Sequence, residues 1–201
     1  MSINVCNNNS LSAITSIPDS ITGSALNLIS TQTASSSATI DFTSGIDSTY
    51  DAYMFKFYNI HPATDNSNFS FQVDTGTNTN YNITTTNTLF HAFHYEADGG
   101  ESLTYDSSRD LAQSTSFTVL IDSLGTDNDQ NASGTLQLFS PSSSTFVKHF
   151  IGSANTNTQN DGSINCFSAG YFNTTTPLTR VQFKMSSGNI DSGVIKLYGI
   201  S

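Results

Sequence analysis

Aromatic residues recur at every second position in short runs of this chain. In YMFKFYNI (53–60), Tyr53, Phe55 and Phe57 alternate with Met54 and Lys56. Successive side chains of a β-strand point to opposite faces, whereas an α-helix repeats every 3.6 residues. The run FSFQV (69–73) shows the same period of two. The alternation therefore predicts strands that bury one aromatic face.

Eleven such runs follow one another from residue 26 onward. Clusters rich in Asn, Asp, Gly, Ser and Thr separate them, such as DTGTNTN and NTNTQNDGS, and these residues favour turns. The sequence predicts an all-β, antiparallel β-sandwich. The number and length of the strands favour a jelly roll, with an immunoglobulin-like sandwich as the alternative. The predicted strands are 26–33, 38–42, 53–60, 69–73, 88–95, 116–123, 134–140, 145–152, 164–172, 180–185 and 192–200.

The last predicted strand, SGVIKLYGI, is apolar on both faces. Ile195 and Leu197 share one face, and Lys196 and Tyr198 lie on the other. We expect this strand to pair within a sheet. An aromatic residue beside Lys196 indicates that the outer face is also partly covered, for example by a neighbouring subunit.

The first 25 residues differ from the rest because they contain no aromatic residue. Pro18 interrupts their helix-like apolar spacing, so we predict an extended or irregular arm. Such an arm either docks on another surface or is a frayed terminus. We divide the chain into an attachment arm with a lead-in strand (1–35) and a sandwich domain (36–201). The candidate attachment residues are Ile3, Val5, Leu11, Ile14, Ile17 and Ile21.

Charge is scarce and mostly negative. Ser, Thr and Asn number 32, 27 and 20, and the formal net charge is -10. Nucleic acids and anionic membranes attract clusters of cations. The six cations are instead scattered along the chain, at Lys56, Arg109, Lys148, Arg180, Lys184 and Lys196. We therefore expect no binding to nucleic acid.

The start of the chain, MSINVCNNNS, lacks the basic and apolar regions of a secretory signal. No stretch of the sequence reaches the roughly 20 apolar residues of a membrane span. We expect synthesis in a cytoplasm without a signal peptide, and no insertion into a membrane.

The titratable residues do not predict a catalytic site. His91 and His94 are three apart and should lie on opposite faces of one strand, while His61 and His149 lie in other segments. The motifs GxSxG, GxxxxGK[ST], GxGxxG and HExxH are absent. We predict no catalytic residue and no cofactor.

Two acidic segments contain oxygen ligands that could bind a cation. Asp122, Asp127 and Asp129 bring oxygen ligands to one region, but they lack the spacing of an EF-hand loop. The segment ADGGESLTYDSSRD is interpreted as a solvated loop. We predict no metal site, and we leave Ca²⁺ binding by the first segment open. Cys166 lies in an apolar run and is interpreted as a small buried hydrophobe; a disulfide with Cys6 is the alternative.

Several segments resemble the small structural proteins of tailed bacteriophages, particularly marine ones. The segments are SLSAITSIP in the arm, YDAYMFKFYNIHPATDN (50–66), TFVKHFIG (145–152), RVQFKMSSGNIDSG (180–193) and the final SSGNIDSGVIKLYGI. The resemblance implies a jelly-roll module displayed on a virion, as a capsid decoration, a head fibre or a fibre tip, and often a trimer. It carries over no catalytic residue.

These observations give three hypotheses. The first is a non-enzymatic virion protein that attaches to the capsid through its arm and trimerises through its sandwich. The alternative is a tail-fibre tip that recognises a host surface polysaccharide, because aromatic platforms beside amides suit sugars. The third is an enzyme such as a depolymerase, which the missing catalytic motifs disfavour.

Overall fold

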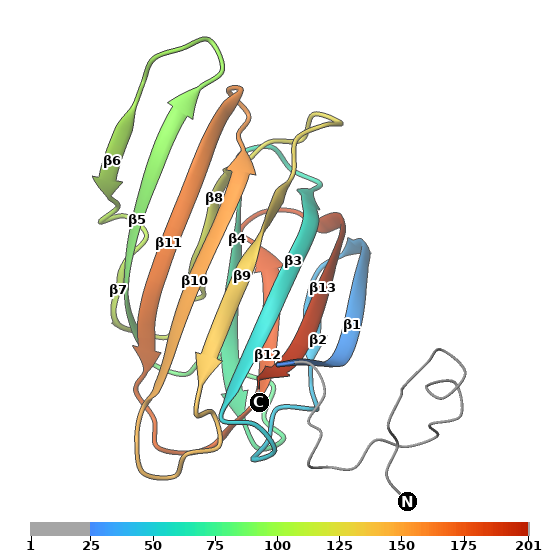
Figure 1. Ribbon diagram of the computed structural model, residues 1–201, viewed down its shortest axis with the longest axis vertical. Coiled ribbons are helices and arrows are strands. Elements are labelled where there is room, and N and C mark those ends of the chain that lie inside the picture. Colours follow the sequence, from blue (N-terminus) through green and yellow to red (C-terminus); the bar gives the residue numbers. More distant parts are fainter. Residues whose placement is uncertain (1–24, 201) are drawn as a thin grey trace, which may run out of the picture.

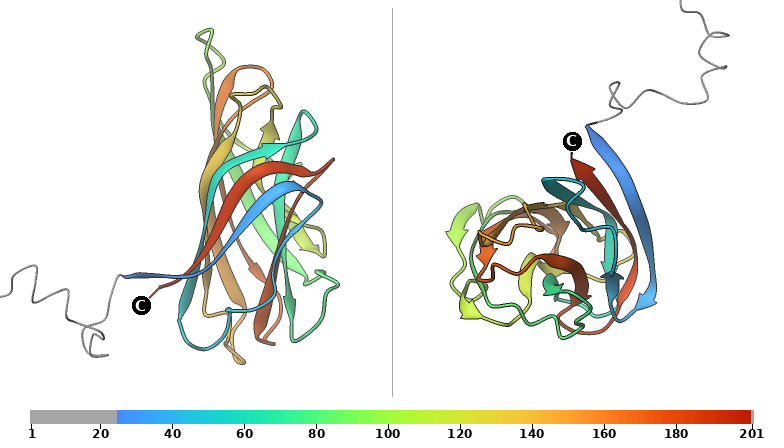
Figure 2. Two further views of the ribbon diagram at one scale, coloured as in Figure 1. Left: turned by 90° about the vertical axis from the view of Figure 1, so that its right-hand side faces the viewer. Right: turned by 90° about the horizontal axis from the view of Figure 1, so that it is seen from below.

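The computed structural model describes residues 25–200, which form two antiparallel sheets packed face to face (Figures 1 and 2). In spatial order, the larger sheet consists of β1 (Leu26–Ser37), β13 (Ile190–Ile200), β3 (Ala52–Pro62), β9 (Ala132–Phe139), β10 (Lys148–Asn157), β11 (Gly162–Phe172), β5 (Thr85–Tyr95) and β6 (Ser102–Tyr105), with β7 (Leu111–Ser114) also paired to β5. The smaller sheet consists of β2 (Ile40–Phe42), β12 (Leu178–Met185), β4 (Ser67–Thr75) and β8 (Thr118–Leu124). The predicted all-β sandwich is confirmed.

The chain passes repeatedly from one sheet to the other. The larger sheet begins with the order β1-β13-β3-β9, and the smaller sheet has the order β2-β12-β4-β8. Strand β8 packs against β10, β11 and β5 of the larger sheet. The strands β10, β11 and β5–β7 extend the larger sheet beyond these eight. The jelly roll remains a prediction, and this strand order favours it over the immunoglobulin-like alternative.

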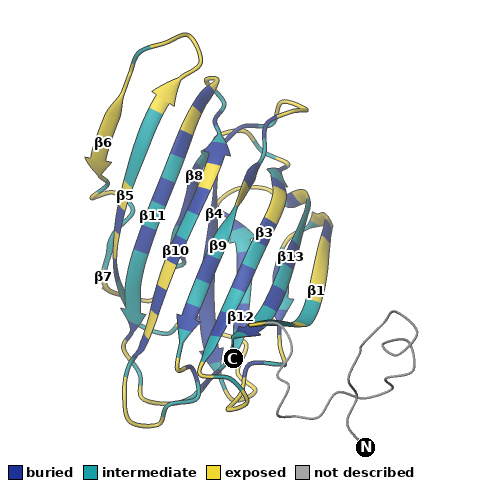
Figure 3. Cartoon of the chain, in the orientation of Figure 1, coloured by how far each residue is buried: buried dark blue, intermediate teal, exposed yellow. Residues whose placement is uncertain are grey.

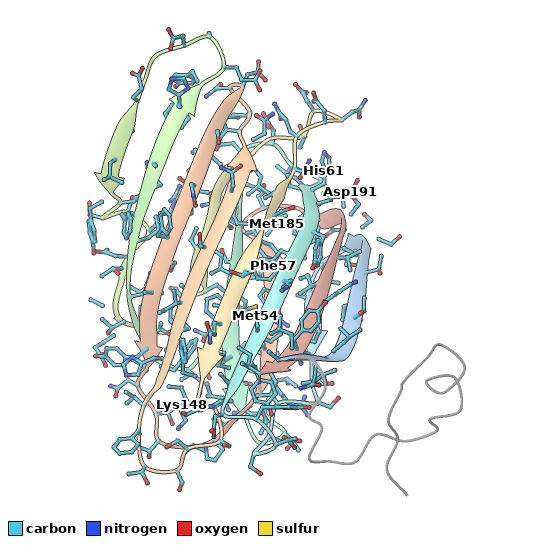
Figure 4. All side chains as sticks on the ribbon, viewed as in Figure 1. Met54, Phe57, His61, Lys148, Met185 and Asp191 are labelled. Carbon is cyan, nitrogen blue, oxygen red and sulfur yellow. The ribbon has the colours of Figure 1, made fainter. Side chains whose placement is uncertain are left out.

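Phenylalanine rings from both sheets fill the space between the layers. The Phe183 ring on β12 contacts the rings of Phe42, Phe55, Phe57, Phe69 and Phe71, with centroid separations between 5.2 and 6.2 Å. All six side chains are at most 2% exposed, and Figure 4 labels Phe57 among them. Aromatic pairs at these separations contribute dispersion in addition to burial. The alternation in 53–60 and 69–73 therefore identified core residues correctly.

The two sheets differ in what covers their outer faces. β4 is buried on both faces because loops cross over it. The buried Gln72 amide donates to the carbonyl oxygens of Ile83 and Ser116 at 3.1 and 3.0 Å. The Asp74 carboxylate accepts the Tyr81 backbone N–H at 2.7 Å. These hydrogen bonds satisfy polar groups that would otherwise destabilise the interior.

Two short strands were missed by the sequence analysis. β6 and β7 lie along the free edge of β5, each over four residues. The segment ADGGESLTYDSSRD, interpreted as a solvated loop, contains β6. These strands form by pairing with β5. Each is only four residues long, which is too short for an alternation such as that of SLTY in β6 to predict a strand.

A turn cluster also proved to be partly strand. β10 begins at Lys148, three residues later than predicted, and continues to Asn157. Its last residues pair with β11, with Asn155 opposite Asn165. Cross-strand hydrogen bonding outweighs the low strand propensity of asparagine here.

β1 pairs with β13 along most of its length. The predicted boundary between residues 35 and 36 therefore lies inside a strand of the larger sheet. The candidate attachment residues, Ile3, Val5, Leu11, Ile14, Ile17 and Ile21, lie outside the described residues. Residues 25–200 include no helix with the length and hydropathy to cross a membrane.

Candidate binding surface

The outer face of the larger sheet is the broadest open surface in Figure 1, because no other described strand packs against it. Exposed large apolar side chains lie on β5, β6 and β10 of this face, and Figure 3 colours the exposed stretches of β6 and β10 yellow. Leu103 is 75% exposed, Ile151 56%, Tyr105 52% and Phe90 41%. We name these four residues, together with Phe167, the apolar strip.

Strand register aligns the members of the apolar strip. Tyr105 on β6 lies opposite Phe90, which in turn lies opposite Phe167 on β11. The rings of Phe90 and Phe167 stack with centroids 5.0 Å apart and an interplanar angle of 14°. Phe90, Phe167 and Ile151 border a shallow, mainly apolar hollow of about 190 Å³. Contiguous apolar surface of this kind marks interaction sites on proteins.

The Tyr105 ring is held at one edge of the strip. Its hydroxyl donates a hydrogen bond to the Asp110 carboxylate at 2.7 Å. This bond, followed by desolvation, raises the pKa of Tyr105 above its ordinary value. The phenol therefore stays neutral over the whole physiological pH range.

A polar hollow lies next to the strip along the same strands. It has a volume of about 300 Å³ and is lined by Ala92, Phe93, His94, Asn155, Ser163 and Asn165. The Asn155 amide donates to the Ser163 hydroxyl at 2.9 Å and to the Ile164 carbonyl at 3.1 Å. The Ser153 hydroxyl points to the Asn165 amide oxygen at 3.5 Å. Amide and hydroxyl groups are thus concentrated beside an aromatic platform.

The other half of the same face carries lysines over tyrosines. The Lys56 ammonium lies 5.4 Å from the centroid of the Tyr198 ring, and the Lys196 ammonium lies 5.5 Å from that of Tyr58. The expected partial cover over Tyr198 is therefore supplied in part within the chain. The expected contribution of a neighbouring subunit stays a prediction.

An ion pair ties the strands of the extension to the smaller sheet. Arg109, just before β7, places Nε and Nη2 each 3.1 Å from the Asp122 carboxylate on β8. The Asp122 side chain is only 10% exposed. Since this carboxylate faces Arg109, it does not join Asp127 and Asp129 in an oxygen-rich cation site.

The four histidines lie in separate surroundings. His61 faces Asp191 across 3.7 Å at one end of β3 (Figure 4), and His149 lies beside the Tyr171 ring. The buried Nδ1 of His91 has no hydrogen-bond partner among residues 25–200, whereas His94 is exposed. These positions agree with the prediction that His91 and His94 lie on opposite faces of one strand.

The structure also brings together three side chains that the sequence analysis did not connect. His94, Asp98 and Glu101 converge at the β5–β6 hairpin. The two acidic residues had been assigned to a solvated loop. The hairpin turns that loop back over the end of the strand. No spacing motif in the sequence predicts that these three side chains converge.

Cys166 and Lys148 are buried on the larger sheet. Cys166 is a free, buried thiol whose pKa burial raises to about 12, so it behaves as the predicted small hydrophobe. Lys148 is fully buried near one end of the larger sheet (Figure 4) and donates to the Thr174 carbonyl oxygen at 3.1 Å. Desolvation lowers the pKa of this ammonium.

Comparisons of the chain with protein-family models, with curated proteins and with solved structures each found no match.

Proposed function

We propose that this protein is a non-enzymatic structural component of a virion. Its sandwich assembles with copies of itself, as a homotrimer, through the apolar strip. Residues 1–25 attach the assembly to a capsid, as a decoration or head fibre. The proposal assigns no catalytic residue and no cofactor.

The apolar strip carries this proposal. Its members are uncharged. The residues that align with them in register on β9, β10 and β11 are also uncharged: Thr135, Gln137, Ser153 and Ala169. Copies of a chain with a formal net charge of -10 repel one another. An uncharged apolar region is where two acidic copies approach with the least repulsion and bury the most apolar surface.

The resemblance to bacteriophage structural proteins supports the virion setting. The surface of the protein is rich in serine, threonine and asparagine, which keeps a displayed module hydrated with little charge. The open larger sheet and the covered smaller sheet give the module one face for contact.

Sedimentation equilibrium of the full chain tests the assembly step. We expect the mass of a trimer for the native protein and of a monomer for a Leu103→Ser/Ile151→Ser variant. Phe146→Ser is the matched control, because Phe146 is 73% exposed but lies outside the strip. A native monomer, or a strip variant that remains trimeric, would contradict the proposal.

Attachment is tested separately with virions that lack this protein. We expect the full chain to bind them and an Ile14→Ser/Ile17→Ser variant to lose binding while it keeps the native mass. If this variant binds the particles normally, the attachment role of the arm is wrong.

A second candidate function is recognition of a host surface polysaccharide, as in a fibre tip. The polar hollow favours it, since Asn155 and Asn165 lie beside the Phe90–Phe167 stack. Amides hydrogen-bond sugar hydroxyls, and aromatic rings pack against the apolar faces of sugars. A glycan array should show binding that Asn155→Ala/Asn165→Ala abolishes at unchanged mass; an array without a hit would rule against this function.

A further inference from the structure

The β5–β6 hairpin gathers three side chains of the types that bind transition metals. His94 comes from the end of β5, and Asp98 and Glu101 come from the loop that follows. The His94 Nε2 atom lies 3.5 Å from Asp98 Oδ1 and 3.6 Å from Glu101 Oε1. All three atoms lie within 4.8 Å of one another.

These separations are too long for hydrogen bonds, which for nitrogen and oxygen lie at about 2.7–3.2 Å. They match the spacing of ligands around a small cation. Zinc bonds of about 2.1 Å at the tetrahedral angle place neighbouring ligand atoms about 3.4 Å apart. The distances from His94 Nε2 to the two carboxylate oxygens are therefore close to those between ligands of one zinc ion.

The backbone of the hairpin holds the two carboxylates above His94. The Tyr95 N–H donates to the Gly99 carbonyl oxygen at 3.1 Å, and the Asp98 N–H donates to the Tyr95 carbonyl oxygen at 3.2 Å. At Gly100, where φ is +74°, a Cβ atom would come within 2.5 Å of the Tyr95 ring. Glycine at this position lets the loop fold back closely.

No lysine or arginine neutralises this cluster. The six cationic side chains of the sequence all lie within residues 25–200, and each is engaged elsewhere: Lys56 with Tyr198, Lys196 with Tyr58, Lys184 with Phe117, Lys148 with Thr174, Arg109 with Asp122 and Arg180 with Gly76. Glu96 adds a further negative charge at this end of the hairpin, where its N–H bonds the Asp161 carbonyl oxygen at 2.8 Å. The local charge thus favours a cation.

We propose that His94 Nε2, Asp98 and Glu101 form a binding site for one zinc ion. The imidazole nitrogen selects zinc over Ca²⁺ and Mg²⁺, which take oxygen ligands. The exposed side chains leave a fourth coordination position open to water or to a group from a binding partner. Because His94 also lines the polar hollow, the ion sits at the edge of the candidate binding surface.

Isothermal titration of the untagged full chain with zinc chloride tests the site. The titration uses a Cys6→Ser background, because a thiolate binds zinc by itself. We expect one ion per chain, at least about tenfold weaker binding in His94→Gln and in Glu101→Gln, and unchanged binding in the control His149→Gln. Zinc binding that is absent, or that His94→Gln leaves unchanged, overturns the proposal.

Cobalt provides a readout of geometry. When Co²⁺ replaces zinc, we expect the strong visible absorption of a four-coordinate ion, and we expect His94→Gln to remove it. The weak absorption of six-coordinate Co²⁺ in the native protein would show that the site lacks the proposed geometry. These variants lie outside the apolar strip. Trimer formation and zinc binding can therefore be lost independently of each other.

Discussion

The protein has two clusters of aromatic rings on opposite faces of the larger sheet, and they differ in what lies above them. Around Phe183, rings from two sheets meet, and each is at most 2% exposed. In the apolar strip, the Phe90 and Phe167 rings stack at a similar separation, yet Phe90 is 41% exposed. Both clusters arise from alternating strand positions. Ring contacts alone therefore do not distinguish a core from a surface. What distinguishes them is whether a second sheet covers the rings.

The largest effect on the free energy of unfolding is expected at Phe183, in the cluster that both sheets cover. Replacing Phe183 with alanine should lower the free energy of unfolding by about 3–5 kcal/mol, because it leaves a cavity among five packed rings. The same change at Phe146, which is 73% exposed, should cost less than about 0.5 kcal/mol. Urea unfolding measures both values. Equal losses in the two variants would refute the assignment of the core.

The Arg109–Asp122 pair should give the next largest effect, because it holds the extension against the smaller sheet. Asp122→Asn should lower the free energy of unfolding by about 2 kcal/mol, since it weakens a charge-assisted contact at a nearly buried site. Asp129→Asn, in the exposed loop, is the control. In an Arg109→Met background, the effect of Asp122→Asn should change, as double-mutant cycles of paired groups show. Additive losses would mean that the two residues act independently.

Lys148 predicts a dependence of stability on pH. Burial lowers its pKa in the folded protein below the ordinary 10.5 of the unfolded chain. Between these two values the unfolded state binds more protons, so the free energy of unfolding should rise as pH increases through this window. Below the window, the folded state carries the full cost of the buried ammonium.

Urea unfolding at several pH values below about 10.5 measures this rise. Lys148→Met should remove it, whereas Lys56→Met, on the outer face, should retain it. A rise of equal size in the native protein and in Lys148→Met would exclude Lys148 as its source.

The smallest effect on stability should come from the apolar strip. A Phe90→Ser/Phe167→Ser variant loses a stacked pair that is open to solvent, so the free energy of unfolding should fall by about 1 kcal/mol or less. Its assembly should nevertheless be lost. A loss of several kcal/mol measured on dilute, monomeric protein would mean that these rings belong to the folded core.

The sequence predicted the parts of the fold that burial determines. Tyr53, Phe55 and Phe57 alternate because one face of β3 is covered, and that signal is local. In β6 and β7 the segments are too short for alternation to be a signal, since each has four residues and depends on the edge of β5. The partly polar end of β10 was missed for the same reason: its partner is β11.

The candidate surface was less predictable than the core. Phe90, Phe167 and Ile151 become neighbours only through the register of β5, β11 and β10. His94 and Glu101 meet only because the hairpin folds back. Such sites depend on which strands pair, and alternation within one strand does not contain that information.

Covalent labelling of side chains by a photogenerated carbene, read by mass spectrometry, tests most directly whether the open face is a contact surface. The full chain would be labelled at low and at high protein concentration. We predict that labelling of Phe90, Leu103 and Ile151 falls steeply as concentration rises, while labelling of Phe146 stays constant. If the chain is shown to be monomeric at the low concentration and trimeric at the high one, equal labelling of the strip at both would place the interface elsewhere and contradict the account.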